Sequence, residues 1–561
     1  MSGEGEIYIK NFWYKDTIVY HIYTFSLANV SFMNNYNETG HKLHEIEKWI
    51  PHIKKLGCDS ILFSPVLKSR SHGYDVTDYL QIDNRIGDNT EFKELVKKFH
   101  ENGIRVILDS VFNHCGRDFF AFQELRSGNR NYADWFSGVD FNRQSPMGDP
   151  FDYDTWSGYY ELVKFNLRNN DVKNYLFDAA RFWINELDID GMRLDSANVT
   201  DFDFMKSLRQ ITTDIKPDFW LMGEVVAGDY PRWVNNEHLH SVTNYILFKG
   251  LFSSHSQNNL YELEHTIQNA QPYNGLPLYT FLDNHDQPRI ASNVDPAHLK
   301  TLYTLLYTLP GVPSIYYGSE WGIQGVKENN SDAPMRPYID IENPPEDKYN
   351  LEGFITKLAK IRNNIPALRY GSYRKIYLEY HRPYVFEREY ENEKVYIAVN
   401  INDTDDSIDL SSHLNNNFID LISGEKVSNP GCILIKPHFA LILAKTEVEI
   451  SPLKDDFIQT EDENNTVQIA GQPSDIEDIT QTVEQLPIES TVQTTEQSLV
   501  IENTTQTAEQ SLVIENVPQN INKDAANDKT TVNKAKLHEI IDNLSENELK
   551  IVYKMFSGFM E

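Results

Sequence analysis

Short apolar runs alternate with helical periodicity over most of the first 370 residues. The apolar runs predict strands over residues 17–25, 60–63, 105–111, 220–225, 244–248, 277–282 and 314–317, with a further strand, fourth in order, beginning at Gly191. Apolar residues spaced by three or four predict helices over 41–56, 91–100, 171–187 and 353–363. Eight strands that alternate with helices are typical of an α/β protein, so residues 1–370 are predicted to form a TIM (β/α)8 barrel.

A long connection separates the third predicted strand from the fourth. Residues 117–168 carry Gly, Pro, Asn and aromatic residues without helical periodicity. Loops at this end of a barrel strand line the barrel mouth, so this segment is predicted to be a small inserted domain that shapes the substrate site.

The pattern changes three times after residue 370. Short alternating runs over residues 371–445 predict an antiparallel β-sandwich. Residues 446–533 hold 18 acidic residues, 3 basic residues and one aromatic ring, with two copies of an 11-residue motif, and we expect a disordered acidic linker there. Residues 534–561 regain helical spacing and predict a short helical hairpin, whose apolar face would bind a protein partner or a second copy of the chain.

Acidic residues follow four of the predicted strands. Asp109, Asp195, Glu224 and Asp286 each stand where an apolar run gives way to polar residues. The C-terminal ends of barrel strands converge on one mouth, so these acids are expected to meet there. Arg193 precedes Asp195 by two residues and shares its strand face, where its charge should lower the pKa of that carboxyl group. Taken alone, the pair is better explained as a structural ion pair, and only the other three acids favour a site.

Composition disfavours several classes of partner. The chain has 51 basic and 83 acidic residues and a net charge of -32, which opposes binding to nucleic acid or to an anionic membrane. Three widely separated cysteines form neither a disulfide framework nor a zinc motif. No apolar run is long enough to cross a membrane, and the acidic first residues do not resemble a signal peptide. We therefore expect a cytoplasmic protein.

Four ordered motifs stand out: Asp109-x-x-x-Asn113-His114, Gly191-x-Arg193-x-Asp195, Glu224 and Asn284-His285-Asp286. These motifs resemble those of the α-amylase family of retaining glycoside hydrolases, glycoside hydrolase family 13. Further agreement occurs at residues 72–79, 111–116, 315–318 and 366–369, so the resemblance covers residues 12–445. Residues 162–166 are similar to a fifth motif of the cyclomaltodextrinase, neopullulanase and maltogenic amylase group. The chain resembles that group most, although the group's N-terminal β-domain is not expected here.

The resemblance implies a catalytic role for three acids. Asp195 would be the nucleophile, and Glu224 would be the general acid and base, kept protonated by the neighbouring negative charges. Asp286 would bind ring hydroxyls and favour the oxocarbenium-like transition state.

The resemblance also implies a set of substrate-binding residues. His114 and His285 would donate hydrogen bonds to sugar hydroxyls, and Tyr74 would lie under the sugar ring as an apolar platform. Asp109 would orient Arg193. The chemistry requires no cofactor.

Departures from the family pattern bear on calcium and on substrate. Some family members bind calcium through the residue that matches Asn113, so a calcium ion outside the chemistry is compatible with the resemblance. Ser196-Ala-Asn198 lacks the Lys-His pair of typical α-amylases, and Val226 replaces a tryptophan of the cyclomaltodextrinase group.

The predicted activity is hydrolysis of α-1,4-glucosidic bonds in maltodextrins and starch oligosaccharides, with transglycosylation. The alternatives are an α-glucosidase or oligo-1,6-glucosidase, and a catalytically inactive glucan-binding scaffold.

Overall fold

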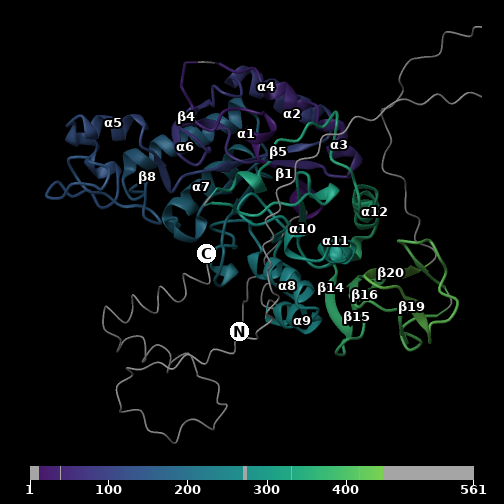
Figure 1. The fold of residues 1–561 in the computed structure, drawn as a ribbon. Helices are drawn as coiled ribbons and strands as arrows, with labels where there is room; N and C mark the ends of the chain where they lie inside the picture. Colours follow the sequence, from purple (N-terminus) through teal and green to yellow (C-terminus); the bar gives the residue numbers. More distant parts are fainter. Residues whose placement is uncertain (1–11, 38, 270–274, 330, 416, 446–561) are drawn as a thin grey trace, which may run out of the picture. The chain divides into compact units, whose positions relative to one another are not determined.

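The computed structural model describes residues 12–445 apart from residues 38, 270–274, 330 and 416 (Figure 1). The predicted linker over residues 446–533 and the predicted hairpin over residues 534–561 lie outside the described residues. Within the described ranges, no helix is both long enough and apolar enough to span a membrane.

Eight parallel strands form a barrel. They are β1 (Val19–Ile22), β2 (Ser60–Phe63), β5 (Arg105–Ser110), β9 (Gly191–Leu194), β10 (Trp220–Gly223), β11 (Ser241–Val242), β12 (Tyr279–Thr280) and β13 (Val312–Tyr316). Their order in the sheet is β11-β10-β9-β5-β2-β1-β13-β12. A parallel bridge between Thr243 and Tyr279 joins the two ends, so the predicted (β/α)8 barrel is confirmed.

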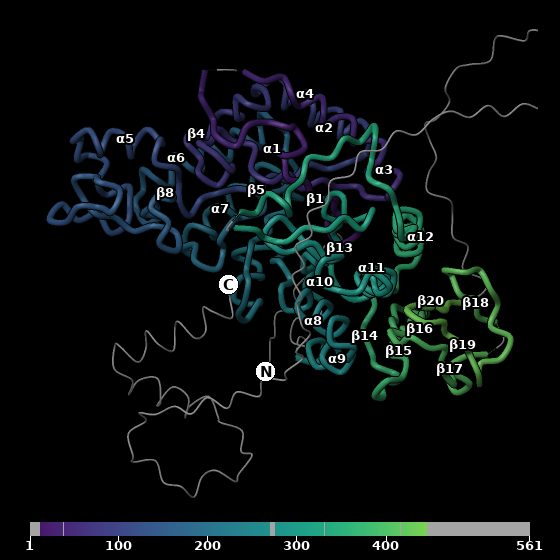
Figure 2. The backbone as a smooth tube through the Cα atoms, viewed as in Figure 1, coloured from purple at the N-terminus to yellow at the C-terminus, as the bar shows by residue number. Residues whose placement is uncertain are grey.

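Helices follow the strands along the chain (Figure 2). They are α1 (Thr24–Leu27), α2 (Leu43–Glu47), α3 (Ile50–Lys55), α4 (Asn89–Glu101), α6 (Asn170–Glu186), α7 (Phe202–Ile215), α8 (Tyr245–Ser256), α9 (Leu260–Asn269), α10 (Ile290–Asn293), α11 (Leu299–Thr308), α12 (Leu351–Asn364) and α13 (Pro366–Tyr370). The helix predicted over residues 41–56 is broken between α2 and α3. Pro51 stands in the first turn of α3 and has no backbone N–H to continue the helix from α2.

The prediction of a sixth strand over residues 244–248 is wrong. That strand is β11, which ends at Val242, and α8 begins at Tyr245. Asn244 caps the helix, because its side chain accepts a hydrogen bond from the backbone N–H of Leu247. The first strand is also shorter than predicted, since α1 begins at Thr24.

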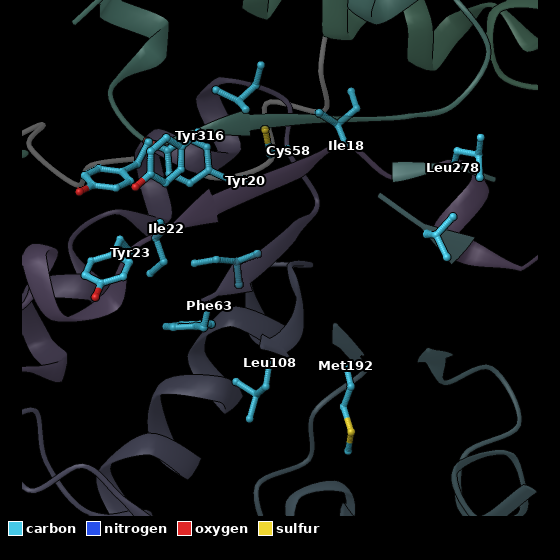
Figure 3. Packing of buried hydrophobic residues seen from close by; sticks show 14 of the residues in the cluster. Ile18, Tyr20, Ile22, Tyr23, Cys58, Phe63, Leu108, Met192, Leu278 and Tyr316 are labelled. Atoms are coloured by element: carbon cyan, nitrogen blue, oxygen red, sulfur yellow. The ribbon is translucent and has the colours of Figure 1, made fainter. Parts of the chain in front are cut away.

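Strand residues alternate between the barrel interior and the side covered by helices. The inward-facing apolar cluster includes Val19, Leu62, Ile107, Trp220 and Met222. The opposite faces contribute to the larger core that Figure 3 shows, with Ile18, Tyr20, Ile22, Phe63 and Leu108. The same period of two turns Asp109, Arg193 and Glu224 into the barrel.

Two small sheets lie outside the barrel. One has the strand order β6-β8-β7 and contains β6 (His114–Gly116), β7 (Thr155–Trp156) and β8 (Tyr159–Lys164), with α5 (Phe120–Arg126) beside them in sequence. The other pairs β3 (Leu67–Ser69) with β4 (Val76–Ile82). Because β6 begins four residues after the end of β5, the first sheet is attached at the mouth end of that barrel strand.

Antiparallel strands follow α13. One sheet has the order β14 (Ser372–Tyr377), β15 (Tyr384–Tyr390), β16 (Glu393–Asn400), β20 (Phe439–Lys445) and β18 (Phe418–Asp420), and a second pairs β17 (Asp406–Ile408) with β19 (Ile433–Ile435). Apolar residues of both sheets share one cluster, which includes Val385, Ala398, Ile408, Ile435 and Leu443. The predicted antiparallel β structure is confirmed.

Buried polar contacts join the sandwich to the barrel. Glu264 on α9 accepts hydrogen bonds from the hydroxyls of Tyr373 and Tyr384, which belong to β14 and β15. Arg388 on β15 donates a hydrogen bond to the carbonyl oxygen of Thr308, the last residue of α11. All five residues are buried.

Candidate active site

Strand register sets Asp195 beside Glu224. Arg193 on β9 lies opposite Asp109 on β5 and opposite Met222 on β10. Asp195 and Glu224 each stand two residues further along neighbouring parallel strands, which run about 4.8 Å apart. Their side chains therefore emerge at the same height on the inner face of the barrel mouth. Both are nearly buried, with 8% and 9% of their surfaces exposed.

Ser196 contacts both of these acids. Its hydroxyl donates a hydrogen bond to Oδ2 of Asp195 at 3.0 Å, and its backbone N–H donates one to Oε2 of Glu224 at 3.1 Å. The left-handed backbone of Ser196, with φ of 51°, accompanies this geometry. The hydroxyl in turn accepts a hydrogen bond at 2.8 Å from the indole N–H of Trp156, which lies in the inserted segment.

Arg193 forms a second connection across the barrel mouth. Its buried guanidinium lies 2.9 Å from Oε1 of Glu224 and 2.7 and 2.6 Å from the two carboxylate oxygens of Asp109. Its nearest approach to Asp195 is 3.9 Å. Arg193 is therefore held mainly by its ion pairs with Asp109 and Glu224, and its ion pair with Asp195 is long.

Burial dominates the titration of Asp195. It raises the pKa of this carboxyl group well above its usual range, and the charge of Glu224 adds to the rise, while Arg193 and the Ser196 hydroxyl oppose it. Arg193 does lower the pKa of Asp195, as predicted, but its charge does not overcome desolvation, so the net shift of the pKa is upward.

Asp286 has the opposite electrostatic environment. Burial acts to raise its pKa, but the charges of His285 and Arg336 outweigh burial and hold the pKa well below its usual range. Nε2 of His285 lies 2.9 Å from Oδ2, and Nη2 of Arg336 lies 3.1 Å from Oδ1. The Asp286 side chain is 39% exposed. It is thus an ionised carboxylate with a face open to a ligand.

Tyr74 and His285 connect Asp286 to the other acids. The Tyr74 hydroxyl donates a hydrogen bond to Oδ2 of Asp109 at 2.9 Å and lies 2.5 Å from Nε2 of His285. The two rings stack at 5.5 Å with an interplanar angle of 13°. The predicted platform residue is therefore also a hydrogen-bonding member of the site.

His114 lies at the side of the site formed by the inserted segment. Its ring is 5.9 Å from that of Trp156, and its Nε2 has no hydrogen-bond partner among the described residues. Burial lowers the pKa of His114 to about 3, so the ring is neutral at physiological pH. The structure thus brings all eight predicted site residues to one end of the barrel.

Four residues of the site were not predicted from the sequence: Ser196, Trp156, Arg336 and Tyr245. The Tyr245 hydroxyl donates a hydrogen bond to Oε1 of Glu224 at 3.3 Å and accepts one from Nδ2 of Asn284. The serine could have been found, since it directly follows Asp195. The other three have no sequence signal: Trp156 lies on β7 of the inserted segment, Tyr245 is the first residue of α8, and Arg336 lies in a loop.

The residues described do not provide the acidic shell that a calcium ion prefers. No group of three or more His, Cys, Asp or Glu side chains in the described ranges could hold a metal ion. The side-chain amide of Asn113 faces Nδ1 of His114 at 3.3 Å. Calcium binding stays a prediction, and no catalytic step below uses a metal.

Comparison with known proteins gives a consistent result. The family described as alpha amylase, catalytic domain, matches residues 26–364. A cyclomaltodextrinase of Thermoanaerobacter pseudethanolicus is 31% identical over 470 residues, which is 79% of this chain and 79% of the relative. A maltogenic alpha-amylase of Bacillus acidopullulyticus is 32% identical over 391 residues, 65% of each chain. A solved cyclomaltodextrinase structure superposes with a TM-score of 0.69 at 26% identity, covering 77% of this chain and 78% of that one.

The sequence motifs, the barrel and these relatives agree. The chain belongs to the alpha-amylase family of glycoside hydrolases.

Proposed function

We propose that this protein hydrolyses α-1,4-glucosidic bonds in maltodextrins with retention of anomeric configuration, and that it also transfers glycosyl groups to sugar acceptors. The observation that carries the proposal is the double contact of Ser196, which donates one hydrogen bond to Asp195 and another to Glu224. Retaining enzymes require two carboxyl groups about 5 Å apart, one on each side of the scissile bond. A single residue that contacts both groups supports that spacing.

The first step forms a covalent intermediate. The carboxylate of Asp195 attacks the anomeric carbon while Glu224 gives its proton to the glycosidic oxygen, so the bond breaks and the leaving sugar departs with a new hydroxyl. This step requires an ionised Asp195 and a protonated Glu224 when the sugar is bound. Arg193, which contacts Glu224 and Asp109, stabilises the negative charge that remains.

The second step releases the product. Glu224, now ionised, takes a proton from a water molecule, and the hydroxide attacks the anomeric carbon to displace Asp195. The configuration is inverted twice and therefore retained. If a sugar hydroxyl replaces the water, the same step transfers the glycosyl group.

Other residues would bind the reacting sugar. Asp286 remains ionised and partly exposed, so it can accept hydrogen bonds from ring hydroxyls as positive charge develops on the ring. His114, whose Nε2 has no hydrogen-bond partner among the described residues, would donate a further hydrogen bond to a sugar hydroxyl. Tyr74 would lie beneath the ring, with its own hydroxyl fixed by Asp109.

The test is a product profile on maltoheptaose, β-cyclodextrin, pullulan and isomaltose, with the anomer of each product followed by NMR. Wild type is expected to cut maltoheptaose and to release the α-anomer first. Asp195→Asn and Glu224→Gln should each lower kcat by about 10⁴-fold or more, because each removes a group that forms or breaks a bond.

The outcomes separate the alternatives. Release of the β-anomer would exclude retention. Cleavage of isomaltose alone would identify an α-1,6-specific enzyme. No cleavage of any substrate by wild type would favour an inactive glucan-binding scaffold.

A further inference from the structure

The segment that follows α1 carries two exposed apolar side chains. Phe32 is 66% exposed, the highest fraction among the large apolar residues that the structure describes, and Met33 beside it is 50% exposed. A single exposed ring is common on protein surfaces. Its meaning therefore depends on how firmly the ring is held and on what lies beside it.

Buried polar groups hold the backbone on both sides of Phe32. Arg85 forms a buried ion pair with Asp83 at 2.8 Å and donates a hydrogen bond to the carbonyl oxygen of Phe32 at 2.6 Å. The side-chain amide of Asn34, which is also buried, donates a hydrogen bond to the carbonyl oxygen of Ser69 at 3.0 Å. A ring on a backbone fixed in this way loses little freedom when a ligand binds, so it is suited to recognition.

A line of rings connects Phe32 to the proposed sugar platform. The ring of Phe32 lies 6.4 Å from that of His72, and the ring of His72 lies 6.0 Å from that of Tyr74. His72 and Tyr74 are both partly exposed. The exposed ring of Phe32 is therefore continuous with the proposed active site and does not belong to a separate surface.

His72 adds a hydrogen-bond donor to this line. Its Nδ1 accepts a hydrogen bond from the backbone N–H of Tyr74 at 3.2 Å. Burial lowers the pKa of His72, so the ring is neutral at physiological pH and its proton lies on Nε2. An N–H group between two aromatic rings suits a sugar chain, which presents both hydroxyls and flat apolar faces.

The order of the barrel strands places Phe32 opposite the proposed general acid. Around the closed sheet, three strands separate β10 from β1 in either direction, β9, β5 and β2 on one side and β11, β12 and β13 on the other. Phe32 follows β1, whereas Glu224 follows β10. Glu224 would give its proton to the glycosidic oxygen, so the leaving sugar departs on the β10 side. Phe32 then lies on the side of the glycone, the part of the substrate that becomes bound to Asp195.

We propose that Phe32 is a specificity-determining residue that stacks on a sugar of the glycone beyond the one bound on Tyr74, with His72 donating a hydrogen bond to a hydroxyl of the same part of the chain. This inference rests on the proposed function, from which it takes the acid and the platform. Substrates with more than one sugar on the non-reducing side of the cleaved bond gain an interaction that a single glucose lacks. Products of at least two sugars are therefore favoured over glucose.

The test compares p-nitrophenyl α-glucoside with p-nitrophenyl α-maltotrioside, which differ only in the length of the glycone. Wild type should have the higher kcat/KM for release of nitrophenol from the maltotrioside. Phe32→Ala should lower that kcat/KM about fivefold, because one aromatic contact is lost, and should leave the value for the glucoside unchanged. A merely structural role of Phe32 would lower both values.

Two further variants control the comparison. Phe32→Tyr keeps an aromatic ring at the same position and should retain the preference for the maltotrioside. Tyr380→Ala removes an aromatic side chain of matched exposure, 65%, between β14 and β15 of the sandwich, and it should act as wild type does on both substrates.

Unchanged kcat/KM for the maltotrioside in Phe32→Ala overturns the proposal, as does an equal fall for both substrates or an equal fall in Tyr380→Ala. Failure of the proposed function is visible separately, as a wild-type protein that cuts neither these substrates nor maltoheptaose. Calorimetric titration with maltotriose then decides. Binding about fivefold weaker in Phe32→Ala supports a sugar contact at this residue, and equal affinities or no binding by wild type overturn it.

Discussion

Ser196 concentrates several interactions of the site in a single residue. Its hydroxyl lies between the indole of Trp156 and the carboxylate of Asp195, and its backbone N–H contacts Glu224. These contacts hold the two acids in position without taking part in any bond change. We therefore expect Ser196 to act as a positioning residue, with an effect on the titration of Asp195.

Replacing Ser196→Ala tests this role. The hydroxyl lowers the pKa of Asp195, so its loss should raise that pKa further. Because the reaction needs the ionised carboxylate, the acid limb of the kcat/KM profile should move to higher pH. At the original optimum, kcat should fall about tenfold, equivalent to about 1.4 kcal/mol, with little change in KM.

Trp156→Phe is the companion variant for the same contact, since it keeps an aromatic side chain but removes the indole N–H together with the five-membered ring. It should shift the acid limb in the same direction by a smaller amount. An acid limb that stays in place in both variants, measured over pH 4–8, would contradict the positioning role.

At the scale of residues, the sequence predicts which acids form the site better than it predicts their ionisation states. Asp109, Asp195 and Glu224 could be predicted because each stands at the C-terminal end of a predicted barrel strand, within a motif that resembles the family. The pKa of Asp195 could not, since it depends on burial, which no local pattern records. Arg336 was missed because it reaches Asp286 from an irregular segment fifty residues later in the chain.

Close packing between β9 and β10 is the feature of the elements that supports the site. Gly223, the last residue of β10, directly precedes Glu224. A Cβ atom at position 223 would lie 2.4 Å from Cδ1 of Leu239 and 2.7 Å from Cβ of Ala197, the neighbour of Ser196. Only glycine lets the two strand ends approach this closely.

Gly223→Ala should therefore damage both stability and catalysis. The overlap is expected to lower the free energy of unfolding by about 1–3 kcal/mol and to reduce kcat, because it moves Ala197 and Glu224 apart. Denaturant unfolding and steady-state kinetics measure the two effects. Gly353→Ala in α12 is the control, since an added Cβ meets no atom within 4 Å and should be neutral or stabilising. Unaltered kinetics in Gly223→Ala would show that catalysis does not require the close packing of the ends of β9 and β10.

The misplaced sixth strand shows where prediction of elements ends. Residues 245–248 are Tyr-Ile-Leu-Phe, an apolar run that suits a buried strand and a buried helix equally well. Asn244 decides between the two structures in favour of a helix, because its side chain caps the helix by accepting a hydrogen bond from the backbone N–H of Leu247. Burial of both faces of a barrel element hides its period, so the flanking cap is the more reliable signal in such a run.

At the scale of the whole molecule, the barrel and the sandwich share buried polar contacts. Glu264 of the barrel accepts hydrogen bonds from Tyr373 and Tyr384 of the sandwich, and all three side chains are buried. The buried carboxylate of Glu264 needs hydrogen-bond donors, and the sandwich supplies two of them through these tyrosine hydroxyls. The two parts are therefore expected to unfold together.

Tyr384→Phe tests this dependence. Removing one hydroxyl leaves the buried carboxylate of Glu264 with one donor fewer, which should lower the free energy of unfolding by about 1–3 kcal/mol. Tryptophan fluorescence, which reports mainly on the barrel, and circular dichroism should still give one coincident transition. Tyr390→Phe, at an exposed position, should change stability by less than about 0.5 kcal/mol. Two separate unfolding transitions in the wild-type protein would contradict the expectation that the barrel and the sandwich unfold together.

The contact of Trp156 has a consequence for attempts to redesign this protein. Exchanging the 117–168 segment for that of a relative is an obvious way to alter which sugars enter the barrel. Such a graft would also remove the indole that fixes Ser196 beside Asp195. A chimera would therefore be expected to slow its turnover as it changes its selectivity, unless the transplanted loop brings its own donor to the same point.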